Sequence, residues 1–105
     1  MRLADIHFHD AQLLRAVEIS PDQELRWEVM YPVDWKNDDY EKRTIVFSEV
    51  TNYEVREGLF VGSLSLLACN VLNEDGGRTR VRIETSAGYR QFEFSNVSMD
   101  DAPET

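Results

Sequence analysis

The clearest pattern in the chain is an alternation of large apolar and polar side chains over residues 25–31. The apolar side chains occupy every second position and are Leu25, Trp27, Val29 and Tyr31. A period of two residues is that of a strand with one buried face, whereas a helix would scatter these four side chains around its circumference. The pattern therefore predicts a half-buried β-strand whose apolar face lies in the core.

A second apolar segment, residues 13–19, precedes this strand and predicts its hairpin partner. Pro21 and Asp22 favour a turn, because Pro presets φ and Asp can accept a hydrogen bond from the backbone just ahead. A loop over residues 21–23 would give the cross-strand pairs Ile19–Leu25, Val17–Trp27 and, on the other face, Glu18–Arg26. Apolar pairs on one face and opposite charges on the other stabilise a hairpin.

Two central segments predict further strands. Residues 44–50 are rich in β-branched and aromatic side chains, which favour a strand. Residues 60–73 fit both the helical and the strand spacing, since an apolar run of this kind is not decided by period alone. We favour a long strand there. Residues 53–58 form a short strand and a turn in the same interpretation, and residues 34–42 form an exposed loop.

The last third of the chain predicts a hairpin around Ala87 and Gly88. Residues 79–85 and 89–94 alternate apolar with polar side chains, and Glu74–Gly77 forms the turn before them. A loop of even length is expected, because only an even loop places the apolar side chains of both strands on one face. The side chains that share this face are Val81, Ile83, Phe92 and Phe94.

These elements predict an all-β fold of six or seven mainly antiparallel strands, arranged as a sandwich or a strongly curled sheet with little helix. The length of 105 residues suits one domain, 1–105, in which residues 100–105 are expected to fray. No apolar run approaches the roughly 20 residues that span a bilayer, and the first ten residues lack the apolar core of a signal peptide. With one cysteine, this pattern favours a cytoplasmic protein.

The charge balance restricts the possible partners. Twenty acidic side chains against 11 basic ones give a net charge of −9, spread evenly along the chain. Binding to nucleic acid or to an anionic membrane needs clustered Lys and Arg, so neither is expected. An acidic surface keeps a small protein soluble and also attracts a basic protein partner.

The segment His7-Phe8-His9-Asp10 is the candidate metal site. In an extended segment His7 and His9 face the same side, where two imidazoles can share one metal, and Asp10 could be a third ligand. No other histidine is present, so further ligands would have to be carboxylates. A surface or structural role for these residues is the favoured interpretation. A metal-binding module or small metalloenzyme is the alternative.

Other catalytic patterns are weak. Cys69 lies among apolar side chains, where a thiol is inert, and no nucleophile or phosphate-loop motif accompanies it. The stripe of Arg78, Arg80 and Arg82 is expected to form ion pairs within the protein, with Glu84 and Glu93 as partners. The sequence therefore predicts a non-enzymatic protein without a cofactor.

The predicted loop over residues 34–42 is the candidate partner-binding site. Trp35 and Tyr40 are large aromatics in an acidic segment that also contains Asp38 and Asp39. Aromatics are common interface anchors, and the acids would complement a basic surface. The alternative is that the loop folds over a sheet edge and uses Trp35 as a plug.

Several short motifs, in this order, resemble a bacterial family. Phe8-His9-Asp10-Ala11 precedes the first strand, Val46–Val50 reads V-F-S-E-V, and the Ala87–Gly88 hairpin follows. The chain resembles small β-rich bacterial proteins of unknown function with an F-H-D-S/A motif, found among immunity-protein candidates of polymorphic toxin systems. It departs from them at Glu49, where the family has Gly.

The resemblance implies an all-β fold and a role in neutralising a toxin, with no catalytic residues to carry over.

A structural subunit of a homo-oligomer, paired through exposed sheet edges, is the remaining alternative for the function of this protein.

Overall fold

The computed structural model describes residues 2–37 and 39–100, and this part of the chain contains eight strands and three short 3₁₀ turns. The strands are β1 (Gln12–Ile19), β2 (Glu24–Asp34), β3 (Asp39–Ser48), β4 (Thr51–Glu57), β5 (Leu64–Asp75), β6 (Arg78–Thr85), β7 (Gly88–Phe94) and β8 (Asn96–Asp100). The 3₁₀ turns are η1 (Leu3–Asp5), η2 (Ser20–Asp22) and η3 (Trp35–Asn37). Over the described ranges no helix is long and apolar enough to cross a membrane.

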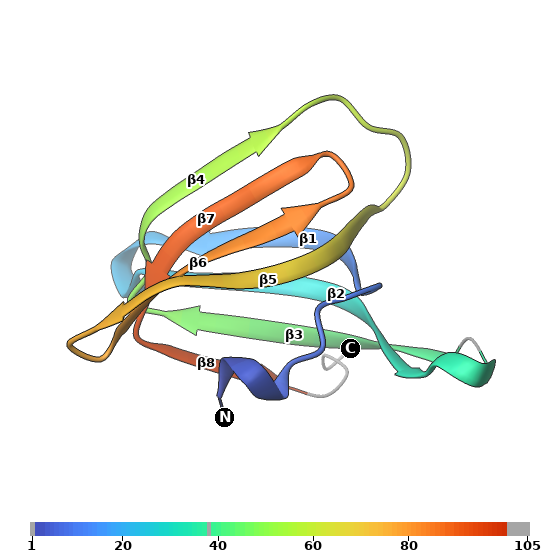
Figure 1. Cartoon of the computed structure of the whole chain (residues 1–105), viewed down its shortest axis with the longest axis horizontal. Coiled ribbons are helices and arrows are strands. Elements are labelled where there is room, and N and C mark those ends of the chain that lie inside the picture. Colours follow the sequence, from blue (N-terminus) through green and yellow to red (C-terminus); the bar gives the residue numbers. More distant parts are fainter. Residues whose placement is uncertain (1, 38, 101–105) are drawn as a thin grey trace.

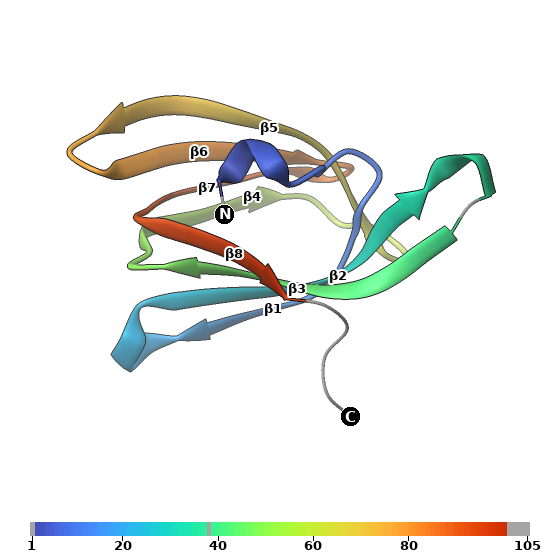
Figure 2. The same ribbon diagram turned by 90° about the horizontal axis from the view of Figure 1, so that it is seen from below.

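The strands form one open antiparallel sheet in the order β4-β7-β6-β5-β1-β2-β3-β8 (Figures 1 and 2). The predictions of an all-β fold and of antiparallel pairing are confirmed, although there are eight strands instead of six or seven. The prediction of a sandwich or a strongly curled sheet is wrong. A short pairing of Gln12 with Ser65 and of Leu13 with Leu64 joins β1 to β5 and unites all eight strands in a single sheet.

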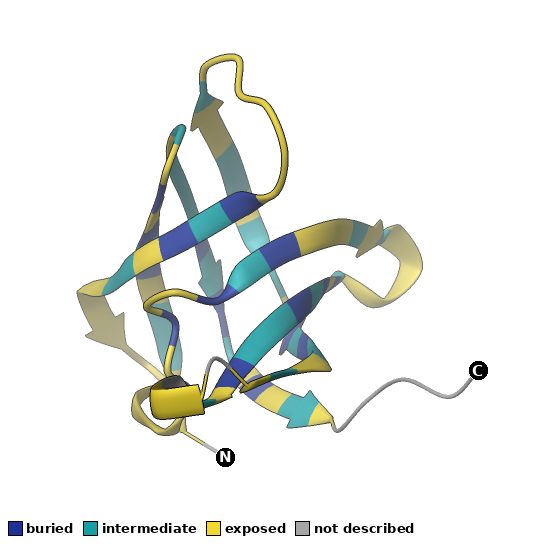
Figure 3. Cartoon of the chain, turned by 90° about the vertical axis from the view of Figure 1, so that its right-hand side faces the viewer, coloured by how far each residue is buried: buried dark blue, intermediate teal, exposed yellow. Residues whose placement is uncertain are grey.

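The core lies between the two halves of this sheet and is centred on aromatic side chains. Trp27 of β2 contacts Phe47 of β3 at a ring-centroid distance of 5.5 Å and Phe92 of β7 at 5.9 Å, both edge to face. This geometry is favourable for aromatic pairs. The alternation over residues 25–31 is confirmed, since three of its apolar side chains are buried and Tyr31 packs against the core. Figure 3 shows buried positions alternating with more exposed ones along the strands.

The register of the first hairpin differs from the predicted one. Four residues, 20–23, separate the two strands, because η2 is followed by Gln23 in a left-handed conformation with φ of 49°. Ile19 therefore lies opposite Glu24, and Ala16 takes the place opposite Trp27 that was predicted for Val17. A bulge after Leu13 shifts the register again. Neither feature has a strong signal in the sequence.

The C-terminal hairpin confirms the predicted even loop, with its position moved by one residue. Ser86 and Ala87 form a two-residue connection, and the four predicted apolar side chains of β6 and β7 are all buried. Arg80 lies opposite Glu93 and its Nη2 donates to a Glu93 carboxylate oxygen at 2.9 Å, as the ion-pair prediction requires. Arg82 lies opposite Gln91 instead of an acid. The strand prediction for residues 60–73 is confirmed from Leu64 onward.

Two segments were assigned wrongly from the sequence. Residues 34–42 are not a loop, since β2 continues to Asp34 and β3 begins at Asp39. Asp100 belongs to β8, where it lies opposite Thr44, so it is not part of a frayed tail. The rest of that predicted tail, residues 101–105, lies outside the described residues.

Candidate functional site

The β2–β3 hairpin extends past the strands on either side of it. Among the described residues, β2 and β3 pair from Leu25 to Asp34, but β1 accompanies β2 only as far as Met30, and β8 accompanies β3 only from Thr44. Residues 31–43 therefore form a two-stranded arm, seen at the right of Figure 2. We call this segment the arm. With no flanking strand among the described residues, the arm is exposed at Val33, Asp39 and Glu41, whereas Pro32 at its base is buried.

The carboxylate of Asp34 accepts two hydrogen bonds from residues of the turn at the tip of the arm. One oxygen of Asp34 accepts a hydrogen bond from the backbone N–H of Lys36 at 3.1 Å, and the other accepts one from Asn37 Nδ2 at 2.8 Å. Such an Asx turn fixes a tight connection between strands. It also gives Asp34 hydrogen-bond partners although it is paired with Asp39, another acid, in the strand register.

Of the four residues predicted to contact a partner, two are described in full on the arm. Asp39 is exposed, and Tyr40 is half-buried opposite Pro32. Trp35 begins η3, and its side chain is not among the described features. Asp38 lies outside the described residues. Asp39 and Tyr40 are consecutive residues of β3 near the tip, so their side chains point to opposite faces of the arm. The contact role of all four residues stays a prediction.

The base of the arm is attached to the N-terminal segment. The backbone N–H of His7 donates to the hydroxyl oxygen of Tyr31 at 2.8 Å. The guanidinium of Arg43 lies 5.8 Å from the centre of the Tyr31 ring and pairs with Glu41 at 2.8 Å. A cavity of about 430 Å³ is lined by His7 and by the arm residues Pro32, Val33, Asp34 and Lys36. These contacts attach the base of the arm to the N-terminal segment.

The candidate metal ligands are neighbours that do not form a ligand set. His7 and His9 face the same, exposed side, as predicted, with ring centres 6.4 Å apart. His9 Nδ1 lies 2.9 Å from the carbonyl oxygen of Leu67, which can only accept, so Nδ1 carries the hydrogen. Its Nε2 lies 3.5 Å from an Asp10 carboxylate oxygen. In the described part of the chain no three His, Cys, Asp or Glu side chains form a group that could hold a metal ion.

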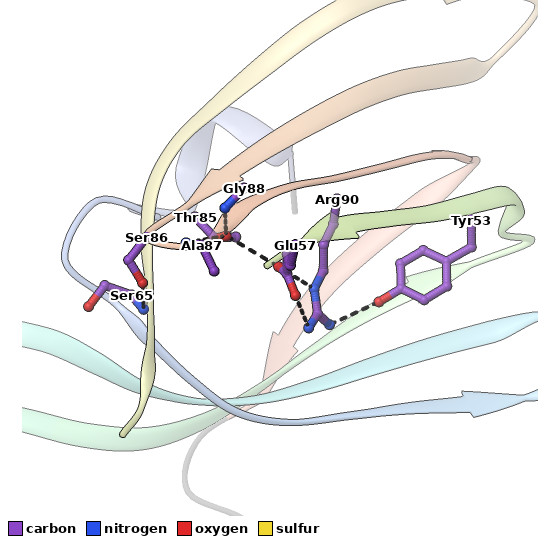
Figure 4. A network of polar contacts seen from close by, with 8 residues as sticks. All are labelled: Tyr53, Glu57, Ser65, Thr85, Ser86, Ala87, Gly88 and Arg90. Atoms are coloured by element: carbon purple, nitrogen blue, oxygen red, sulfur yellow. Dashed lines mark hydrogen bonds and ion pairs between the residues drawn. The ribbon is translucent and has the colours of Figure 1, made fainter. Parts of the chain in front are cut away.

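A buried polar network, which the sequence interpretation missed, connects β4 to β7 (Figure 4). Arg90 donates through Nε and Nη2 to the two carboxylate oxygens of Glu57, both at 2.9 Å. The side chains are only 13% and 6% exposed, respectively. Arg90 Nη1 also donates to the hydroxyl of Tyr53 at 3.1 Å, and the Thr85 hydroxyl donates to Glu57 at 3.2 Å.

The electrostatics of this network indicate a structural clamp. Burial raises the pKa of Tyr53 in spite of the opposing effect of Arg90. Burial alone would lower the pKa of Arg90, but its bonds to Glu57 and Tyr53 outweigh this effect and raise it. Both carboxylate oxygens of Glu57 are occupied, so this acid is not placed to exchange protons with a substrate. One feature of the sequence pointed to a buried Arg90: it lies on the same side of the strand as the inward-facing Phe92 and Phe94.

A groove of about 500 Å³ lies beside this clamp, between β1, β4 and the β4–β5 connection. Tyr53 and Arg90 form its polar part, and apolar side chains that include Leu14, Val55 and Phe60 form much of the rest. The groove exists because β1 pairs with β5 only at its first two residues, which leaves the rest of this edge of β1 without a neighbouring strand among the described elements.

Cys69 lines a second cavity, of about 740 Å³, beneath the N-terminal segment. Burial raises the pKa of its thiol from 9.0 to about 12. Near pH 8 the reactive thiolate is therefore roughly a thousandfold scarcer than for a thiol with the ordinary pKa.

We expect the thiol of Cys69 in the native protein to react with a thiol reagent several hundredfold more slowly than in the same protein in denaturant. Equal rates in the two states would contradict this assignment.

Comparison with known proteins found no matching family model, no matching curated protein and no matching solved structure.

Proposed function

We propose that this protein is a non-enzymatic binding domain that docks a basic protein partner through its arm. The observation that carries the proposal is that residues 31–43 project beyond the described parts of both neighbouring strands and present the exposed carboxylate of Asp39 near the tip. A projecting hairpin can enter a cleft that a flat sheet cannot reach.

Long-range charge supports the same proposal. The chain has a net charge of −9, which accelerates the approach of a basic protein and disfavours acidic competitors. At contact, aromatic side chains such as Tyr40 would supply most of the affinity, because buried aromatics dominate interface energies. Steering by charge and anchoring by the arm are thus separate contributions, and added salt should weaken mainly the first.

The mode of action that fits this arrangement is steric occlusion. An immunity-type protein blocks a toxin by covering a basic functional surface, and it needs no catalytic residues of its own. The resemblance of the Phe8–Ala11 segment to immunity-protein candidates supports this mode.

Capture of partners by variants of the immobilised protein tests the proposal. We expect the double variant Trp35→Ala/Asp39→Ala to lose at least about tenfold in capture of a basic protein, since truncating interface anchors costs 1–2 kcal/mol or more each. The matched control is Leu72→Ala/Glu74→Ala, which removes an exposed apolar and an exposed acidic residue from β5.

The control variant should capture the partner as the wild type does, and both variants should keep the circular dichroism of the native fold. Equal capture by the arm variant and the wild type would contradict docking through the arm. Loss of capture in the Leu72/Glu74 variant alone would place the interface on the β5–β6 hairpin instead.

A further inference from the structure

β4 is the strand at one edge of the sheet, and its register with β7 decides which of its backbone groups point outward. β4 pairs with β7 in a register that places Glu54 opposite Gln91 and Arg56 opposite Tyr89. The backbone N–H of Gly58 donates to the carbonyl of Ala87 at 3.1 Å in the same register. Hydrogen-bonded pairs alternate along an antiparallel ladder. The backbone N–H and C=O groups of Glu54 and Arg56 therefore point towards β7. The N–H and C=O of Val55 therefore point outward.

The side chains of this edge are self-complementary. Glu54 and Arg56 lie on the exposed outer face, one residue before and one after Val55, and form an ion pair at 2.6 Å within the strand. If a second copy pairs antiparallel about Val55, Glu54 of each copy lies opposite Arg56 of the other. Opposite charges in directly opposed positions stabilise a strand pair, and two equivalent pairs arise from the symmetry.

We propose that two copies of this chain form a homodimer by antiparallel pairing of their β4 edges about a two-fold axis at Val55. Each Val55 would exchange both backbone hydrogen bonds with its counterpart, so that the sheet continues from one copy into the other. This interface is separate from the arm, and either can exist without the other.

Exposed apolar side chains next to β4 extend the surface. Leu59 and Val61 are fully exposed, and Val55 is 45% exposed. The register about Val55 carries Leu59 of one copy towards Thr51 of the other. Contact of this loop with the second copy would add apolar burial to the short ladder, which alone is smaller than a stable dimer interface.

The other edge of the sheet lacks this complementarity. The described residues of β8 include one acid, Asp100, and no basic side chain. Two β8 edges therefore have no ion pair to offer each other, and this difference favours β4 as the dimer edge.

Sedimentation equilibrium with charge-reversal variants tests the inference. The wild type should form a dimer, and Glu54→Arg or Arg56→Glu should each weaken it by about tenfold, because each places like charges in both cross-strand pairs. A mixture of the two single variants should recover the wild-type affinity as a heterodimer, since the charges are again opposite. Glu84→Arg, which changes an exposed acid on β6, should leave the dimer unchanged.

Hydrogen exchange locates the contact independently. The Val55 amide should exchange slowly only at concentrations at which the dimer forms. A wild type that stays monomeric at its highest soluble concentration would overturn the inference. So would a dimer that ignores charge reversal at Glu54, or a mixture of variants that recovers nothing.

Discussion

Replacement of Trp27 by Ala is expected to lower the free energy of unfolding by about 3–5 kcal/mol. Trp27 is completely buried and contacts the rings of Phe47 and Phe92 from the other half of the hairpin and the other half of the sheet. Its removal leaves a cavity between the two halves and ends two edge-to-face contacts. Urea denaturation, compared with the wild type, measures the loss.

Two further variants make the Trp27 result specific. Trp27→Phe keeps a ring in contact with its neighbours and should lose less stability than Trp27→Ala. Val33→Ala truncates an apolar side chain on the arm that is exposed, so its effect should stay within about 0.5 kcal/mol. A loss below about 1 kcal/mol for Trp27→Ala would show that the tryptophan does not fill the core.

Replacement of Arg90 by Met should lower the free energy of unfolding by about 3–5 kcal/mol. The substitution preserves much of the apolar stem but leaves the carboxylate of Glu57 buried without its two guanidinium hydrogen bonds. An uncompensated buried charge is more costly than the absence of the whole pair. The loss should appear in urea denaturation at neutral pH.

The double variant Glu57→Gln/Arg90→Met is the matched control for the clamp. The amide has no charge to compensate, and its oxygen can still accept the hydrogen bond of Thr85. The double variant should therefore be more stable than Arg90→Met by at least about 1 kcal/mol. If the double variant is instead less stable than both Glu57→Gln and Arg90→Met, the loss of the ion pair itself, and not the unpaired charge, accounts for the loss in free energy of unfolding.

The strand assignments that succeeded depend on side chains that touch the core. In β2, β6 and β7 the stretches that contact the core carry a large apolar side chain at every second position, so period and burial agree at Trp27, Val81 and Phe92. The even loop between β6 and β7 followed from the same constraint, because register decides which face each side chain occupies.

The elements that were missed have little or no apolar signal. Beyond Pro32 the arm leaves the interior, so its strands carry mostly polar residues and resemble a loop. In β4 the last inward-facing residue is Glu57, a buried charge whose partners, Thr85 and Arg90, come much later in the chain. β8 buries only Val97. Such elements depend on pairing with distant strands, which a local pattern does not contain.

The candidate site remains a prediction from composition, and the structure adds the shape of the segment that carries it. The acids and aromatics of residues 34–42 indicated a contact surface, and the structure arranges Asp39 and Tyr40 on a projecting hairpin. The metal hypothesis followed from spacing alone. Spacing placed His7 and His9 on one side correctly, but a third ligand depends on tertiary structure.

Hydrogen exchange of the chain, alone and with the basic protein that we propose it binds, tests the role of the arm most directly. The account predicts that the partner slows exchange of backbone amides within residues 31–43, while the amides of β6 and β7 in the core exchange at their former rates. Protection that falls on other edges or faces, with the arm amides unchanged, would contradict docking through the arm.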